Sequence, residues 1–501
     1  MNQPDFIVVG AGSAGCIIAR RLARDFGATV TLVETNSEPA PAMNRNRPAR
    51  WLRLLKSSDD WNFTTGQIEK LANRSLHWPR GRGIGGSSRI NAMIWFPPTR
   101  GDLLKLTQAT NGQWTPTRIT EAFDSIEALL QPEKAHWLSS ASKTFLQAVE
   151  KEKNATPMAY DRLQHHGRRR SLETLLHDTD NGVRSWHSRI EITRGNVDRI
   201  AWRNQHASGV TLMKGDGETT LTSKKGVILT AGTIGTPCIL MRSGIGDKES
   251  LEKLGIHLQV SRPAVGQQLH DHLIMPVIFR LKQIKERFSD EFNPRSLVRW
   301  QTLGTGPLCS NLTECGGLFM EEKIQLHVTP THYLSFPKID NAAWMSIGVN
   351  ATQPKSQGEV RITSANPLDA PEIKPNYLCN HNDLVETLQG VQFVRDLTKQ
   401  KEFEALIDSE VLPGSRRDSE NSIQRAIERY AQTLYHPLGT CGVGTSDDAV
   451  VDPMFQVRGT SGVWVADGSV FPGITVGNPN AMIMSLAWIA AEEIMGTSGL
   501  S

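Results

Sequence analysis

The sequence has no surplus of charge of either sign and no long apolar run. Its 501 residues include 55 Lys and Arg and 52 Asp and Glu, which gives a net charge of +3. This small charge argues against a nucleic-acid-binding surface, and we interpret the basic run at residues 168–170 as a solvated loop. The most apolar stretch, residues 481–491, is shorter than the roughly 20 residues of a membrane span. We therefore expect no nucleic-acid partner and no membrane span.

Cysteine is scarce and scattered. None of the six cysteines forms a C-x-x-C pair or a zinc-binding spacing, which argues against a zinc site and a disulfide scaffold. Two of them, Cys16 and Cys238, lie in apolar, helix-like surroundings and are expected in the core. The cysteine usage is typical of a reducing compartment, and the first predicted strand begins by about residue 5. We therefore expect no secretory signal before it and a cytoplasmic location.

A glycine motif near the start of the chain is typical of dinucleotide-binding proteins. Gly10, Gly12 and Gly15 follow the apolar run 6–9 and precede the helix-like run 17–23. Gly10 permits a tight turn, Gly12 lets the backbone approach a pyrophosphate, and Gly15 lets the helix lie close to the sheet. The start of the helix offers free N–H groups and a positive dipole end to the phosphates.

A second apolar run, residues 28–33, ends at Glu34. The spacing from the glycine motif is that of an acidic side chain that accepts hydrogen bonds from a ribose. A glycine motif alone does not distinguish FAD from NAD, and it also occurs as a plain turn in ordinary α/β domains. Because strand, turn, helix, strand and acid follow in order, we predict a nucleotide site here.

In a further segment, residues 81–95, a glycine-rich start precedes a helix-like run, and its backbone can approach phosphate or flavin atoms closely. It resembles the first signature of the glucose-methanol-choline (GMC) family of flavin-dependent oxidoreductases. Residues 232–246 resemble the second signature, and the apolar run 226–231 before them predicts a buried strand. The resemblance continues through residues 266–273 into the C-terminal third, so it covers nearly the whole chain.

The resemblance implies an α/β fold, α+β overall, with a doubly wound Rossmann-like FAD domain that is discontinuous in sequence. Because 501 residues are many for one hydrophobic core, a second domain is expected. It is a substrate domain built on an antiparallel sheet backed by helices. We expect the FAD domain at residues 1–130, 191–274 and 431–501, the substrate domain at 275–430, and a shortened substrate-side insertion at 131–190.

The expected substrate domain alternates like β-strands at residues 326–330 and 345–349 and is helix-like at 384–398. Its candidates to line the substrate pocket are His327, His332, Tyr333 and Trp344. The alternative for each of these residues is a packed or surface position.

The segment His270-Asp271-His272 places two histidines at strand spacing, on one face. A metal site draws further ligands, and none can be identified in the sequence. We interpret this segment as a structural turn beside the flavin domain and expect no metal.

His436 is the candidate catalytic base. A lone histidine is more often structural, but residues 435–441 resemble the family's catalytic segment, in which this histidine faces the reactive edge of the flavin. Histidine titrates near neutrality, so it can take the hydroxyl proton of an alcohol while the carbon-bound hydrogen passes as hydride to flavin N5. Asn478, where relatives carry histidine or asparagine, would donate a hydrogen bond to the developing alkoxide.

The resemblance also implies which residues bind FAD. These are Gly10, Gly12, Ser13, Ala14, Gly15, Glu34, Gly86, Asn91, Ile94, Val197, Ala231, Asp467, Gly468, Asn478 and Asn480. Some relatives attach FAD through a histidine of the first signature. Ile90 takes that position in this chain, so we expect non-covalent FAD.

We therefore expect a choline-dehydrogenase-like flavoprotein that oxidises an alcohol to an aldehyde or ketone, with oxygen or another electron acceptor. One alternative is a lyase of the same family that splits hydroxynitriles without net redox change, and another is a non-catalytic flavin-binding protein. A light-driven fatty acid decarboxylase shares the fold. That enzyme lacks a histidine at the position of His436 and has a cysteine where this chain has Thr313.

Overall fold

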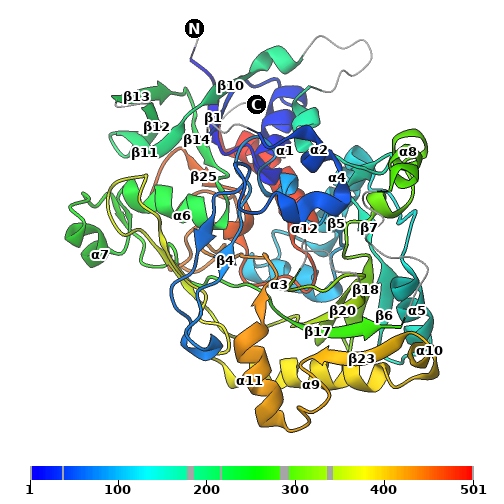
Figure 1. Ribbon diagram of the computed structural model, residues 1–501. Coiled ribbons are helices and arrows are strands. Elements are labelled where there is room, and N and C mark those ends of the chain that lie inside the picture. Colours follow the sequence, from blue (N-terminus) through cyan, green and yellow to red (C-terminus); the bar gives the residue numbers. More distant parts are fainter. Residues whose placement is uncertain are drawn as a thin grey trace.

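The computed structural model describes residues 3–35, 39–177, 186–214, 217–282, 293–335 and 342–498. Two large sheets organise it, one parallel and one antiparallel, and helices α1 and α12 lie close to the parallel sheet (Figure 1). A separate cluster of buried apolar side chains surrounds each sheet.

The parallel sheet has the strand order β10-β2-β1-β14-β25. Its strands are β1 (Phe6–Val9), β2 (Val30–Glu34), β10 (Ile190–Arg194), β14 (Gly226–Leu229) and β25 (Val463–Val465). All but β10 are buried along their whole length, as expected for apolar strands covered on both faces. β14 pairs with both β1 and β25, so the sheet joins segments from the start, middle and end of the chain. The predicted discontinuous α/β fold is confirmed.

Helix α12 (Asn480–Thr497) contains the apolar stretch 481–491 and packs against α1 (Ser13–Arg24) and α4 (Pro116–Leu130). None of the helices in the described ranges combines the length and apolar composition that crossing a membrane requires. Beside the parallel sheet, α6 (Gly232–Arg242) packs against a three-stranded antiparallel sheet. That sheet consists of β11 (Asn196–Arg203), β12 (His206–Lys214) and β13 (Gly217–Thr222).

The second large sheet is antiparallel, with the order β23-β17-β20-β19-β18-β6, and β24 also pairs with β17. Its strands are β6 (Thr156–Ala159), β17 (Leu273–Leu281), β18 (Cys315–Phe319), β19 (Ile324–Thr329), β20 (Ala343–Ala351), β23 (Ile407–Leu412) and β24 (Gln432–Thr433). Helices α9 (His381–Leu397) and α5 (Ser140–Val149) pack against it. The predicted strands at 326–330 and 345–349 and the helix at 384–398 correspond to β19, β20 and α9.

Shorter elements connect these layers. The remaining helices are α2 (Ala42–Asn46), α3 (Arg100–Ala109), α7 (Lys248–Lys253), α8 (Pro294–Leu303), α10 (Lys401–Glu404) and α11 (Glu420–Tyr430). The two-stranded pairs are β3 (Phe63–Thr64) with β4 (His77–Trp78), β5 (Ile94–Trp95) with β7 (Asp161–Arg162), β8 (Gln164–His165) with β9 (Arg168–Arg169), β15 (Ile245–Gly246) with β16 (Val260–Ser261), and β21 (Glu359–Arg361) with β22 (Glu372–Lys374).

The helix-like run expected after the glycines of the segment 81–95 is wrong. A short 3-10 helix, η3 (Gly86–Arg89), is followed by the strand β5. Met93 has a φ of +59°, which no helical residue adopts, and its N–H donates to the side-chain oxygen of Asn91 at 3.0 Å. This side-chain turn stops the helix before it can extend.

Candidate active site

The turn after β1 requires glycine at two positions. Gly10 has a φ of +102°, and a Cβ there would lie 2.5 Å from the carbonyl oxygen of Thr230. A Cβ on Gly15 would lie 1.9 Å from the carbonyl oxygen of Gly10, so only glycine lets α1 approach the turn this closely. Gly12 is the N-cap of α1, and no described side chain caps that helix start. Its N–H groups and the helix dipole therefore favour an anion.

A second glycine loop and a second helix start meet the first. A Cβ on Gly86 would lie 2.7 Å from Cα of Gly12, so the two loops are in backbone contact. Ser13 Oγ at the start of α1 donates to Asn480 Oδ1 at the start of α12 at 2.7 Å. Ala14, in the first turn of α1, is buried. Two glycine loops and two helix N-termini thus form one anion-favouring site.

Glu34 lies at the carboxyl end of β2. Its Oε2 accepts a hydrogen bond from the N–H of Ala11 at 2.7 Å, and its Oε1 accepts one from Thr35 N–H at 2.8 Å. Burial raises the pKa of this carboxyl group, and the backbone donors oppose the shift. Gly195 N–H donates to the carbonyl of Glu34 at 3.0 Å, which brings the half-buried Val197 to the same edge of the sheet.

Asp467 ties the second signature to the C-terminal segment. Its Oδ2 accepts from the N–H of Gly232 at 2.8 Å and from Thr236 Oγ1 at 2.6 Å, both on α6. Ala231 is the N-cap of α6, and a Cβ on Gly468 would lie 2.9 Å from a threonine hydroxyl of that helix. These contacts place Ala231, Asp467 and Gly468 together.

Asn91 is held by a buried arginine. Nη1 of Arg169 donates to Ser88 O at 2.7 Å and to Asn91 Oδ1 at 2.9 Å, and Nη2 donates to Asn91 O at 2.7 Å. The interpretation of residues 168–170 as a solvated loop is therefore wrong for Arg169, which is 9% exposed. Its guanidinium donates to oxygens of the first signature, and the local sequence around residue 169 does not reveal these distant partners. Burial lowers its pKa to about 9, and the charge of Asp59 offsets part of this.

The predicted cofactor residues fit FAD. The two open helix starts suit a pyrophosphate, and the Glu34 carboxylate at the end of β2 is of the type that accepts hydrogen bonds from a ribose. Ile94, within the first signature, is buried in β5. Ile90 packs in an apolar cluster with Ala40 and Leu54.

Polar side chains from distant segments converge on His436. Its backbone N–H donates to Asp271 Oδ1 at 2.6 Å, and its Nδ1 lies 2.9 Å from Nδ1 of His272. Its Nε2 lies 3.1 Å from Nδ2 of Asn478. Gln325 Nε2 donates to Asn478 Oδ1 at 3.2 Å, which orients that amide. The structure therefore brings the two predicted catalytic residues together.

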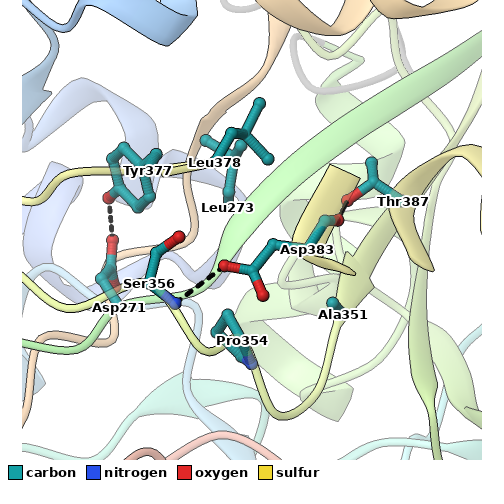
Figure 2. A pocket seen from close by; sticks show the side chains of 9 residues that line it. All are labelled: Asp271, Leu273, Ala351, Pro354, Ser356, Tyr377, Leu378, Asp383 and Thr387. Atoms are coloured by element: carbon teal, nitrogen blue, oxygen red, sulfur yellow. Dashed lines mark hydrogen bonds between the residues drawn. The ribbon is translucent and has the colours of Figure 1, made fainter. Parts of the chain in front are cut away.

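Asp271 anchors this arrangement. Besides the backbone of His436, it accepts hydrogen bonds from Thr433 Oγ1 at 2.6 Å and from the Tyr377 hydroxyl. Figure 2 shows Tyr377 and Asp271 facing each other beside a small cavity whose lining also includes Asp383. Burial raises the pKa of Asp271 to about 6, and the two hydroxyl donors oppose the shift. Asp271 fixes the backbone of the candidate base.

We assign the histidine tautomers from the hydrogen bonds. The carbonyl oxygen of Thr352 can only accept, so His272 Nε2, 3.0 Å away, carries a proton. In the neutral ring His272 Nδ1 is then an acceptor, and His436 Nδ1 must donate to it. The lone pair of His436 therefore lies on Nε2, toward the Asn478 amide.

The ring of His436 is neutral at ordinary pH. Burial, followed by the nearby His272 and His327, lowers the pKa of His436 below its usual range. Burial also lowers the pKa of His272 to about 4 and that of His327 to about 3. A neutral imidazole with its lone pair on Nε2 is the form that accepts a proton.

The other predicted pocket residues divide into two groups. His327 is buried on β19 and close enough to influence the pKa of His436. His332 and Trp344 pack against each other with ring centroids 4.8 Å apart. Tyr333 is partly buried, and its N–H donates to Ser346 Oγ at 3.1 Å. The described contacts of these three residues do not reach His436.

Sequence reasoning missed the roles of Asp271, His272 and Gln325. The segment 270–272 is more than a structural turn, because two of its side chains bond to His436. Gln325 could have been found from its position two residues before His327 in a predicted strand, because residues two apart in a strand lie on the same face. Across the described ranges, no three His, Cys, Asp or Glu side chains are grouped to hold a metal ion.

Two sequence profiles described as GMC oxidoreductase match this chain, at residues 4–274 and 354–487. An alcohol dehydrogenase [acceptor] of Pseudomonas putida is 32% identical, and the match covers 98% of this chain and 95% of that protein. An oxygen-dependent choline dehydrogenase of Brucella canis is 28% identical, with 100% and 97% covered.

Solved structures share the fold. A formate oxidase from Aspergillus oryzae has a TM-score of 0.88 at 24% identity, covering 99% of this chain and 98% of that one. A fungal aryl-alcohol oxidase has a TM-score of 0.83 at 20% identity, covering 99% of both chains. The profiles and relatives establish an FAD-binding oxidoreductase that acts on CH–OH groups, and the chain belongs to the GMC oxidoreductase family.

Proposed function

We propose that this protein oxidises an alcohol to an aldehyde or ketone with His436 as the base and Asn478 as the hydrogen-bond donor to the substrate oxygen. The observation that carries the proposal is the Nε2 lone pair of His436, which faces the amide of Asn478 at 3.1 Å. The Asn478 amide donates to that lone pair at 3.1 Å. A substrate hydroxyl would replace this contact: it would give its proton to Nε2 and accept a hydrogen bond from the Asn478 amide.

Bound FAD supplies the hydride acceptor, and it would lie across the glycine loops with its pyrophosphate at the starts of α1 and α12. Asp271 and His272 hold the base, and Gln325 holds the amide of Asn478. We further propose that the cofactor is non-covalent, since Ile90 offers no nucleophilic atom. Acid precipitation should then release the yellow colour into the supernatant.

The test is anaerobic mixing of the purified, FAD-loaded protein with primary, aromatic, polyhydric and amino alcohols. Loss of the visible absorption of oxidised flavin would support alcohol oxidation, and admission of air would distinguish oxygen from another acceptor. A yellow protein that no alcohol reduces would contradict the proposal. Cyanide release from a hydroxynitrile without loss of flavin colour would identify a lyase instead.

The variant His436→Ala should keep FAD and slow flavin reduction by about 10²- to 10⁴-fold, the usual contribution of a positioned base. His257→Ala is the matched control, because His257 is exposed on the loop after α7. Equal rates in both variants would remove His436 from the mechanism.

A further inference from the structure

One face of β19 carries polar side chains at alternate positions. Gln325, His327 and Thr329 are 0%, 2% and 4% exposed. The alternate residues point the other way: Ile324, and Val349 opposite Leu326 on β20, face α9, where a Cβ on Gly390 would meet both. The polar face of the strand is therefore directed away from the helix layer.

This face leads to the candidate catalytic residues. Gln325 donates to Asn478 at 3.2 Å, and His327 lies close enough to lower the pKa of His436. On β20, Asn350 is directly opposite Gln325 and is 0% exposed. Residues opposite each other in adjacent strands project to the same face. We call Gln325, His327, Thr329 and Asn350 the polar row.

Every member of the polar row has a buried polar atom without a hydrogen-bond partner among the described residues. These atoms are Gln325 Oε1, both ring nitrogens of His327, Thr329 Oγ1 and Asn350 Oδ1. Buried polar atoms are nearly always hydrogen-bonded, because leaving them unpaired costs free energy. A row of such atoms beside a base is what a binding site for polar groups requires.

The donors and acceptors of the polar row define the chemistry of its ligand. Two amide oxygens accept only, a neutral imidazole donates once and accepts once, and a hydroxyl does both. Burial keeps the His327 ring neutral, with a pKa of about 3. None of the four side chains carries a charge, and a quaternary ammonium group has no proton to donate to them. A hydroxyl, which donates and accepts, matches the row.

We propose that the polar row binds a second hydroxyl group of the substrate, so that this protein prefers diols or polyols to monohydric and to quaternary ammonium alcohols. The proposal rests on the alcohol oxidation proposed above and names the substrate class of that site. Substrate hydroxyl one contacts His436 Nε2 and the Asn478 amide in place of the hydrogen bond between them, and hydroxyl two contacts His327 and its neighbours along β19.

The experiment compares substrates of one chain length: 1-butanol, 1,2-, 1,3- and 1,4-butanediol, with choline as the cationic alcohol. Anaerobic flavin reduction at a range of concentrations gives both the limiting rate and the Kd. We expect at least one diol to exceed 1-butanol in specificity constant by about 10- to 100-fold, the effect of one or two buried hydrogen bonds. The gain should appear mainly in Kd.

Two variants test the residues. His327→Phe keeps a ring and removes both nitrogens, and Thr329→Val is nearly isosteric. Each should lower the diol-to-butanol ratio by about tenfold, whereas the exposed His381→Phe should leave that ratio unchanged. If His327→Phe does not fold and bind FAD, the diol-to-butanol ratio of Thr329→Val alone tests the assignment.

Different results overturn different steps. If 1-butanol or choline equals the best diol, or if both variants keep the wild-type ratio, the assignment of the polar row is wrong while alcohol oxidation stands. If no alcohol reduces the flavin, alcohol oxidation itself fails, and the assignment fails with it.

Discussion

We predict that His272 fixes the proton of His436 on Nδ1, and that removing this acceptor slows flavin reduction. His272→Leu keeps a branched apolar group at the δ position but cannot accept a hydrogen bond. The His436 ring, buried and 2.9 Å from its partner, would then carry an unpaired N–H or would place its proton on Nε2, where it cannot act as a base.

The size of the effect follows from the same contact. An unpaired buried donor costs about 1–3 kcal/mol. The alternative tautomer avoids that cost, but its proton is on Nε2, which then cannot accept the proton of the substrate. The active tautomer is therefore disfavoured by roughly that amount, which corresponds to a rate loss of about 5- to 150-fold. FAD binding should not change, because the glycine loops are built by other residues.

The matched control is His272→Asn. Its Oδ1 takes the position of the lost Nδ1 and can accept from His436, although the bond to the carbonyl of Thr352 is lost. We expect the asparagine variant to keep most of the reduction rate at a cost of about 1 kcal/mol in the free energy of unfolding.

The assay is rapid anaerobic mixing of each FAD-loaded variant with the best alcohol, with the FAD content and the pH profile measured in parallel. At equal FAD content, flavin reduction should be slow in His272→Leu and fast in His272→Asn. If both variants lose the same rate, His272 only supports the fold. If leucine matches the wild type, the tautomer assignment is wrong.

Three further predictions concern the cofactor site and stability. Gly12→Asp should lose FAD because its charge repels the pyrophosphate at the start of α1, whereas the neutral isostere Gly12→Asn should keep more, by flavin absorbance per protein; equal losses would point to sterics. Arg169→Met should lower the free energy of unfolding by about 1–3 kcal/mol, since it leaves the buried carbonyl of Ser88 without this donor, and denaturant titration that finds no change would refute this. Burial lowers the pKa of His270 and His272 to about 4 and that of His327 to about 3; the contribution of these rings to stability should be constant above the unfolded value of about 6.5 and fall below it by about 1.4 kcal/mol per pH unit for each ring, until the folded pKa is reached, while the raised pKa of Asp271, about 6, offsets one ring between pH 6 and 4. Stability that is flat from pH 7 to 5 in thermal melts would contradict these buried neutral rings.

Local sequence determined the nucleotide-binding turn and the strands. The positive φ at Gly10 and the close approach at Gly15 permit only glycine, so the glycine motif predicts the geometry of the turn. Alternation of apolar residues likewise predicted β19 and β20, because side chains of a strand point to opposite faces in turn. The signatures indicated His436 and Asn478 by resemblance.

The tertiary structure alone decided which polar side chains meet. The contact of His272 with His436 spans 164 residues, and it depends on the pairing of β17 with β24. Arg169 has the same local sequence whether it is solvated or buried beneath the first signature. A hydrogen bond between distant segments leaves no periodic pattern in the sequence. A required glycine, or the alternation of apolar residues in a strand, is visible within a few residues. The sequence therefore predicted the scaffold and the candidate base, and the structure supplied the neighbours that orient this histidine and the polar row beside it.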